Sequence, residues 1–143
     1  MEIDFVNKSI SFIDEINKID LRKFKRIHLI GMGSSYNACL LGSYWIEKIA
    51  KIPTVCSNSS EFRYRDPVIE EGSSLIPVSQ SGETADTIAA MDMEIKRRSS
   101  IEDKKFKPNL IAITNRKESS IGRQVKNIID ICAGIEVGVA ATK

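Results

Sequence analysis

Short apolar runs alternate along the chain with longer stretches in which apolar residues recur every three or four positions. The short runs predict buried strands over 26–31, 53–57, 75–79, 109–114 and 128–132. The recurring pattern predicts helices over 35–51 and 84–98, and one or two helical turns over 59–65. Strands that alternate with helices predict an α/β protein, with a parallel sheet covered by helices on both faces.

The first residues follow a pattern of their own. An amphipathic helix is predicted over 3–19, because apolar side chains stand at positions 3, 6, 10, 13 and 16. We therefore divide the chain into an N-terminal helix and linker, residues 1–25, and a single α/β domain, residues 26–143. A chain of 143 residues is long enough for one domain with a sizeable core.

Pro77 lies inside the third predicted strand and conflicts with it. Proline has no backbone N–H to donate to a neighbouring strand. We expect either a bulge at Pro77 or a ladder that is one hydrogen bond short.

The first and third predicted strands both end in glycine and hydroxyl residues that lead directly into a helix. Gly31-Met-Gly-Ser-Ser35 follows the first strand, and Ser79-Gln-Ser-Gly-Glu-Thr84 ends the third. The first N–H groups of a helix have no partner within it, and the helix dipole makes this end partly positive. Ligands of parallel sheets bind at the carboxyl ends of the strands, so the two loops predict a site for a phosphate-bearing ligand. The alternative is a hydroxyl-rich helix cap without a ligand.

The first of these loops also carries half of the glycine pattern of dinucleotide-binding folds. That pattern has a third glycine, where Tyr36 stands here, and an acidic residue about 20 positions later. No carboxylate occurs in that region before Glu61. A nicotinamide cofactor is therefore not predicted.

Neither loop contains the histidine or lysine that a general base would require. His28, the one histidine of the chain, lies within the first predicted strand, and we expect it to be structural. Glu83 is the only carboxylate of the second loop. We expect it in the first turn of the next helix, where the dipole favours it, rather than acting as a base. Glu136 is a second, weaker candidate for a base.

Composition and charge exclude several classes of protein. A formal net charge of +2 favours neither nucleic acid nor an anionic membrane as a partner. No run approaches the roughly 18 apolar residues of a membrane span, and the first residues do not resemble a signal peptide. The three cysteines fit no zinc pattern, which favours free thiols in a reducing compartment. We expect a cytoplasmic protein with no metal and no cofactor.

Four segments carry a resemblance to a known family: Gly33-Ser-Ser-Tyr-Asn37, Ser60-Glu-Phe-Arg-Tyr64, Ser79-Gln-Ser-Gly-Glu-Thr-Ala-Asp86 and Gly134-Ile-Glu-Val-Gly-Val-Ala-Ala-Thr-Lys143. In this order and at these separations they resemble the first sugar-isomerase (SIS) domain of the glucosamine-6-phosphate synthases, also called glutamine–fructose-6-phosphate transaminases (isomerising). The resemblance extends from about Arg26 to the end of the sequence. It implies a three-layer sandwich around a five-stranded parallel, flavodoxin-like sheet.

The same resemblance implies that the site binds the phosphate of fructose 6-phosphate or glucosamine 6-phosphate. The implied substrate-binding residues are Ser34, Ser35, Ser79, Gln80, Ser81, Thr84 and Val139. Ser34 stands where the family usually has threonine, and Val139 would contact the sugar through its backbone. Met32 replaces a usual cysteine, which excludes thiol chemistry there. Ala141 replaces a common serine and leaves one contact to the sugar open.

Members of this family carry two further parts that are not expected here. Their glutaminase domain begins with Met-Cys, whereas Glu2 follows Met1 in this sequence. The second SIS domain, which supplies a catalytic glutamate, histidine and lysine in the family, would follow Lys143. We expect a chain without catalytic residues of its own that binds a hexose phosphate. It would associate as a homodimer or with a second SIS domain, and bind neither nucleic acid nor membrane.

Two alternatives remain at this point. The first is a stand-alone regulatory module that senses a phosphosugar as a homodimer, in a version without a DNA-binding segment. The second is an isomerase completed by self-association, with Glu61 or His28 supplied across the dimer.

Overall fold

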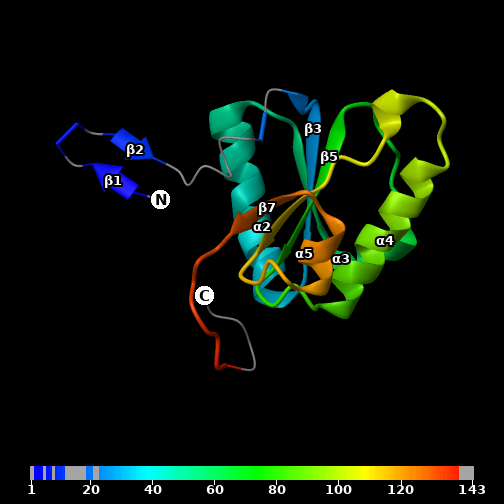
Figure 1. The fold of residues 1–143 in the computed structure, drawn as a ribbon. Helices are drawn as coiled ribbons and strands as arrows, with labels where there is room; N and C mark the ends of the chain where they lie inside the picture. The colour runs from blue at the N-terminus through cyan, green and yellow to red at the C-terminus, as the bar shows by residue number, and fades with distance from the viewer. Residues whose placement is uncertain (1, 5, 8, 12–18, 21–22, 139–143) are drawn as a thin grey trace.

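A computed structural model describes residues 2–4, 6–7, 9–11, 19–20 and 23–138. Its main feature is a sheet of five parallel strands in the order β4-β3-β5-β6-β7 (Figure 1). The strands are β3 (Arg26–Gly31), β4 (Thr54–Asn58), β5 (Ser73–Ser79), β6 (Ile111–Thr114) and β7 (Asn127–Asp130). The helices are α2 (Gly33–Trp45), α3 (Ser59–Arg65), α4 (Ala85–Ser99) and α5 (Ser120–Gln124). A π-helical turn, η2 (Ile46–Ala50), extends α2, and a 3-10 turn, η3 (Lys104–Phe106), precedes β6.

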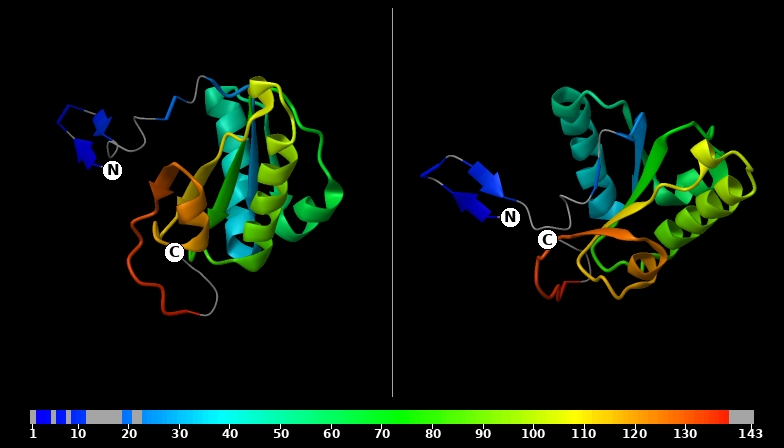
Figure 2. Two further views of the ribbon diagram at one scale, coloured as in Figure 1. Left: turned by 45° about the vertical axis from the view of Figure 1, so that its right-hand side comes forward. Right: turned by 45° about the horizontal axis from the view of Figure 1, so that its top comes forward.

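The helices form two layers, one on each face of the sheet. Among the described residues, α2 lies alone on one face, and α3, α4 and α5 cover the other (Figures 1 and 2). This confirms the α/β sandwich with a parallel five-stranded sheet. The strand order is the flavodoxin-like one, in which the chain reverses direction across the sheet between its first and third strands.

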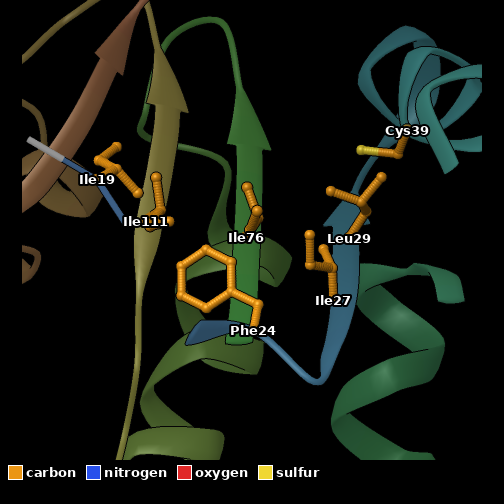
Figure 3. Close-up of a cluster of buried hydrophobic side chains, with 7 residues drawn as sticks. All are labelled: Ile19, Phe24, Ile27, Leu29, Cys39, Ile76 and Ile111. Carbon is orange, nitrogen blue, oxygen red and sulfur yellow. The ribbon is translucent and has the colours of Figure 1, made fainter. Parts of the chain in front are cut away.

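Alternation of side chains along the strands divides the core between the two faces. On the face of α2, Ile27 and Leu29 of β3 pack with Ile76 of β5 and Ile111 of β6 (Figure 3). Cys39 reaches this cluster from α2, and Ile19 and Phe24 complete it from the segment before β3. On the other face, two smaller clusters join the sheet to α3, α4 and α5.

Pro77 keeps its place within β5, and the ladder is interrupted beside it. β5 pairs with β6 through the bridge Leu75–Leu110 and again from Val78–Ile113, with the same register on both sides. An unchanged register means that no residue is inserted, so the sheet tolerates proline by omitting a hydrogen bond, not by bulging.

The N-terminal helix prediction is wrong for the residues that the structure describes. Glu2–Asp4 (β1) and Ser9–Ser11 (β2) form an antiparallel pair with Ile3 opposite Ile10. β-branched isoleucine suits a strand, and two runs of three residues joined by a turn also produce apolar spacings of three and four. Residues 12–18 lie outside the described part, and the division at residues 25 and 26 stays a prediction.

Candidate functional site

A cleft of about 1050 Å³ lies at the carboxyl edge of the sheet, where the ends of several strands and the starts of two helices meet. It is lined by Met32, Gly33, Ser34, Ser35, Gln80, Ser81, Thr84, Asn115, Arg116, Asp130, Cys132, Gly134, Ile135, Glu136 and Gly138. The lining comes from the loops after β3, β5, β6 and β7. Because β3 and β5 are neighbours in the sheet, the two hydroxyl-rich loops share one site, as the sequence predicts.

The two helices that begin at this cleft have open N-termini. Neither Met32, before α2, nor Thr84, before α4, makes a side-chain capping hydrogen bond. The other two α-helices of the described residues are capped: the Asn58 side chain accepts from the Ser60 N–H at the start of α3, and Ser119 Oγ accepts from the Gly122 N–H in α5. Capping normally satisfies the free N–H groups of a first turn. At the cleft no capping side chain stands between these helix starts and a ligand.

The loop between β5 and α4 is held by its own hydroxyls. Ser79 Oγ accepts from the Gly82 N–H at 3.0 Å and lies 2.9 Å from Thr84 Oγ1. Gly82 has φ +66°, and a Cβ atom there would lie 2.0 Å from Ser119 Oγ. Glycine is therefore required at this position both by its backbone conformation and by the close approach of the α5 cap.

Glu83 has a different role from the one the sequence predicts. α4 begins at Ala85, so Glu83 precedes its first turn, where Asp86 stands instead. Its carboxylate accepts a hydrogen bond of 2.8 Å from the Ser120 N–H at the start of α5. The hydrogen bonds from Ser120, and then the nearby Arg123 and Arg116, hold the pKa of Glu83 below its usual value. A carboxylate stabilised in its charged form is a weak base.

Asn115, which the sequence analysis missed, joins three of the loops around the cleft. Its backbone N–H donates to the Gln80 carbonyl at 3.1 Å, and its side chain donates to the Gly134 carbonyl. Its Oδ1 accepts from the Ala133 N–H at 2.8 Å. Asn115 and Arg116 directly follow the predicted strand over 109–114, and this position at the carboxyl edge is the signal that could have identified them.

The structure brings most of the predicted binding residues together. Those that line the cleft are Ser34, Ser35, Gln80, Ser81 and Thr84. Ser79 lies beneath the loop, 2% exposed, with its hydroxyl engaged inside it. Val139 lies outside the described residues. Direct contact between any of these side chains and a substrate stays a prediction.

The two residues considered for a dimeric isomerase lie away from this cleft. His28 Nε2 is 2.9 Å from Ser57 Oγ, and its ring packs edge-on against Phe62. Burial, and then the charge of Arg65, lowers the pKa of His28 to about 4. Glu61 lies in the first turn of α3. Neither borders the cleft formed by the described residues.

Comparison with known proteins agrees with this geometry. The model of the SIS domain family matches residues 20–143. The chain belongs to the SIS domain family. None of the helices in the described ranges has the length and apolar character of a membrane span. Within those ranges no group of three or more His, Cys, Asp or Glu side chains is placed to hold a metal ion.

The relatives of this SIS domain include two aminotransferases. It is 50% identical over 123 residues to the glutamine–fructose-6-phosphate aminotransferase (isomerizing) of Thermosynechococcus vestitus, a match that covers 86% of the chain and 20% of the relative. It is 45% identical over 123 residues to the enzyme of the same name from Chlamydia trachomatis, covering 86% and 19%. The chain thus spans about one-fifth of the length of these relatives.

Solved structures show the same fold. The C-terminal domain of glucosamine-fructose-6-phosphate aminotransferase from Francisella tularensis superposes with a TM-score of 0.72 and 39% identity, covering 85% of this chain and 32% of that one. Glucosamine-6-phosphate deaminase from Thermotoga maritima gives a TM-score of 0.63 and 26% identity, covering 82% and 35%. The resemblance found in the sequence, to the SIS region of the glutamine–fructose-6-phosphate aminotransferases, is confirmed.

Proposed function

We propose that this SIS domain binds a hexose phosphate, fructose 6-phosphate or glucosamine 6-phosphate, and holds it by its phosphate. The observation that carries the proposal is the pair of uncapped helix starts, of α2 and α4, beside one cleft. Hydroxyls of Ser34, Ser35 and Ser81 line the same cleft. Relatives named for fructose 6-phosphate and a structural neighbour named for glucosamine 6-phosphate support this class of ligand.

The chemistry of the cleft suits a phosphate better than an uncharged group. Each helix start contributes about half a positive charge, and backbone N–H groups donate to whatever lies in front of them. Hydrogen bonds to a charged acceptor contribute about 1.5–3 kcal/mol each, more than those to a neutral one. A phosphate offers oxygens in several directions, so it can accept from both loops at once.

Calorimetric titration of the chain with fructose 6-phosphate tests the proposal. Ser81→Ala removes one hydroxyl from the cleft and is expected to weaken binding about tenfold, since one charge-assisted hydrogen bond is lost. Ser100→Ala, at the far end of α4, is the matched control and should bind like the unmodified chain. Fructose without phosphate should give no heat. Absence of heat with millimolar fructose 6-phosphate or glucosamine 6-phosphate, or identical binding by Ser81→Ala, contradicts the proposal.

We propose further that the chain alone does not convert the sugar. Isomerisation needs a general base within hydrogen-bond reach of the reacting carbons, and neither histidine nor lysine is found in the described lining of the cleft. Glu136, which lines it, accepts a hydrogen bond from the Gly138 N–H, and Glu83 is engaged at α5. Incubation of concentrated protein with fructose 6-phosphate and glutamine should yield no glucosamine 6-phosphate. Formation of that product would reject this part of the proposal.

The proposal includes association with a second SIS domain or with a second copy of this chain. Support comes from α2 and η2, which expose Leu41 (49%), Trp45 (57%) and Ile49 (78%). Beside α2 lies a largely apolar groove of about 500 Å³, floored by Leu29, Val78 and Ile113. Exposed apolar surface of this kind marks an interaction face. Sedimentation equilibrium should show self-association that is reduced in Trp45→Glu.

A stand-alone phosphosugar sensor is the second candidate, favoured by the same apolar face. A sensor must couple ligand binding to association, because a ligand with equal affinity for both states shifts nothing. Sedimentation with and without fructose 6-phosphate separates the two: an unchanged association constant rejects the sensor. A cytoplasmic location belongs to both versions, and the three free cysteines are compatible with it.

The remaining alternative, an isomerase completed across a dimer, is the least supported. Its histidine would be His28, which is bonded to Ser57 and has its pKa lowered to about 4. A base is most effective when its pKa lies near the working pH. Failure to interconvert fructose 6-phosphate and glucose 6-phosphate at high protein concentration would remove this alternative.

A further inference from the structure

Arg116 is the one cationic side chain in the described lining of the cleft, and it is exposed. The predicted phosphate-binding residues, by contrast, offer only hydroxyls, an amide and backbone N–H groups. A phosphate monoester carries close to two negative charges at neutral pH. Two helix starts supply about half a charge each, so partial charges alone leave about half of that charge uncompensated.

Lys117, the neighbouring cationic residue, already forms an ion pair. Lys117 Nζ lies 3.7 Å from Asp130 Oδ2, and Lys117 is not part of the described cleft lining. The Arg116 guanidinium forms neither a hydrogen bond nor an ion pair with any other described residue. Of the other arginines, Arg63, Arg97 and Arg98 are each paired with a carboxylate. Arg116 acts on Glu83 only through its field, so its fork of donors is not used in any hydrogen bond or ion pair among the described residues.

The backbone of Arg116 is fixed against the loop between β5 and α4. Its N–H donates to Thr114 Oγ1 at 3.3 Å, and the preceding N–H, of Asn115, donates to the Gln80 carbonyl at 3.1 Å. Thr114 Oγ1 in turn lies 3.5 Å from the Gln80 carbonyl oxygen. The backbone of Arg116 is therefore fixed next to Asn115, which is hydrogen-bonded to the loop that contains Gln80 and Ser81.

We infer that Arg116 is a specificity-determining residue, which pairs with the phosphate of the bound sugar and favours phosphorylated sugars over neutral ones. The inference rests on the proposed function and adds to it the source of a full positive charge. A guanidinium matches a phosphate with two parallel N–H donors, which adds direction as well as charge. Hydroxyls and helix starts would orient the phosphate, and Arg116 would set the difference between charged and uncharged ligands.

The test is titration of the unmodified chain, Arg116→Gln and Arg116→Lys with fructose 6-phosphate and with inorganic phosphate, at low and at physiological ionic strength. Arg116→Gln should weaken binding of both ligands about tenfold at low salt, the effect of losing one charge-assisted pair. Its binding should also depend less on salt, because an exposed charge pair is screened. Arg116→Lys should lie between the two, since lysine keeps the charge and loses the fork.

Arg123→Gln is the matched control. Arg123 is also exposed and also acts electrostatically on Glu83, but it lies in α5 and does not line the cleft. The Arg123→Gln variant should bind fructose 6-phosphate and inorganic phosphate as the unmodified chain does. Equal weakening by Arg123→Gln would mean a general field rather than a contact, and would overturn the inference. So would weakening by Arg116→Gln that affects fructose 6-phosphate but not inorganic phosphate.

The two proposals fail in distinguishable ways. If the unmodified chain gives no heat with fructose 6-phosphate, the proposed function and this inference are both rejected. If the unmodified chain binds and Arg116→Gln binds equally well, only the inference is rejected. Thermal unfolding of Arg116→Gln should match that of the unmodified chain, because Arg116 is exposed and its guanidinium makes no hydrogen bond or ion pair with another described residue. A lower melting temperature would show a structural role instead.

Discussion

Two arginines at opposite edges of the sheet differ in how their guanidinium groups are used. At the amino edge, Arg98 is buried and donates to Glu94, to Ser73 and to the carbonyls of Glu70 and Phe106. At the carboxyl edge, Arg116 is exposed and its guanidinium donates to no other described residue. Both edges are polar and both are hollowed, the amino edge by a cavity of about 340 Å³.

The difference separates a structural polar cluster from a candidate binding site. At the amino edge each buried side-chain donor and acceptor of the described residues has a partner within the protein. At the carboxyl edge of the described residues, the starts of α2 and α4 lack side-chain caps and Arg116 makes no direct ion pair, although capped helices and paired arginines occur elsewhere in the same domain. Residue type alone therefore says little, and what distinguishes the candidate site is two helix starts without side-chain caps beside an exposed guanidinium without an ion pair.

The largest effect is expected from Arg98→Ala at the amino edge. It removes the 2.6 Å ion pair with buried Glu94, which keeps only Arg97 at 3.2 Å, and should lower the free energy of unfolding by about 3 kcal/mol, the lower end of the range for a broken buried pair. Urea denaturation measures this. The double variant Glu94→Leu, Arg98→Met should recover much of the loss, because it removes both charges and keeps the volume. A loss below about 1 kcal/mol would mean that the cluster is not structural.

His28 should make the amino edge sensitive to pH. Its folded pKa of about 4 lies below the unfolded value of 6.5, so the folded protein binds the proton less well. The contribution of neutral His28 to the free energy of unfolding is complete above pH 6.5 and is lost as the pH falls toward about 4. The free energy of unfolding changes by about 3 kcal/mol over this range. In His28→Asn this part of the pH dependence should disappear in urea denaturation between these values. A parallel decline in both proteins would assign the pH dependence to other groups.

Thr84→Asp should trade binding for stability at the carboxyl edge. Aspartate is a better N-cap than threonine, and α4 now lacks a side-chain cap, so stability should rise by about 0.5–1 kcal/mol. The same carboxylate would occupy the open helix start and repel phosphate, so fructose 6-phosphate should no longer give heat. Thermal unfolding and calorimetry measure the two effects. Unchanged binding would show that the start of α4 does not face the ligand.

The smallest effect is expected from an exposed ion pair at the amino edge. Arg26 Nε lies 3.1 Å from Glu70 Oε2, with about 40% of each side chain exposed (39% and 42%). Such pairs contribute little because water screens them, so Glu70→Gln should change the free energy of unfolding by no more than about 0.5 kcal/mol. Compared with Arg98→Ala in the same urea assay, it tests whether burial, rather than pairing, makes the amino edge structural. Similar losses in both variants would contradict this view.

Much of the fold follows from local patterns in the sequence. Apolar runs mark all five strands of the sheet to within a few residues, and Pro77 predicts the interruption of the hydrogen-bond ladder between β5 and β6. The same reasoning fails at the N-terminus, where Ile3, Val6 and Ile10, three and four residues apart, belong to two paired strands and their turn in place of a helix. A spacing measured over so few residues fits both structures, and only the partner strand decides between them.

The candidate site was predictable where its chemistry lies close together in sequence. Ser34, Ser35, Gln80, Ser81 and Thr84 belong to two loops that follow predicted strands, and parallel strands bring such loops to one edge. Contacts between distant segments were not predictable in this way. Three interactions depend on neighbours whose positions the sequence does not give. They are the hydrogen bond from the Gly82 N–H to Ser79 Oγ, the one from the Ser120 N–H to Glu83, and the one from the Asn115 N–H to Gln80.

The sequence by itself thus determined most of the elements, the parallel sheet and the two hydroxyl-rich loops that lead into helices, because these depend on periodicity and on residues close along the chain. Only the tertiary structure decided which polar groups are satisfied and which are left open. Arg98 and Arg116 show why: whether a guanidinium is buried among acceptors or exposed in a cleft depends on strand order and on loops far apart in sequence.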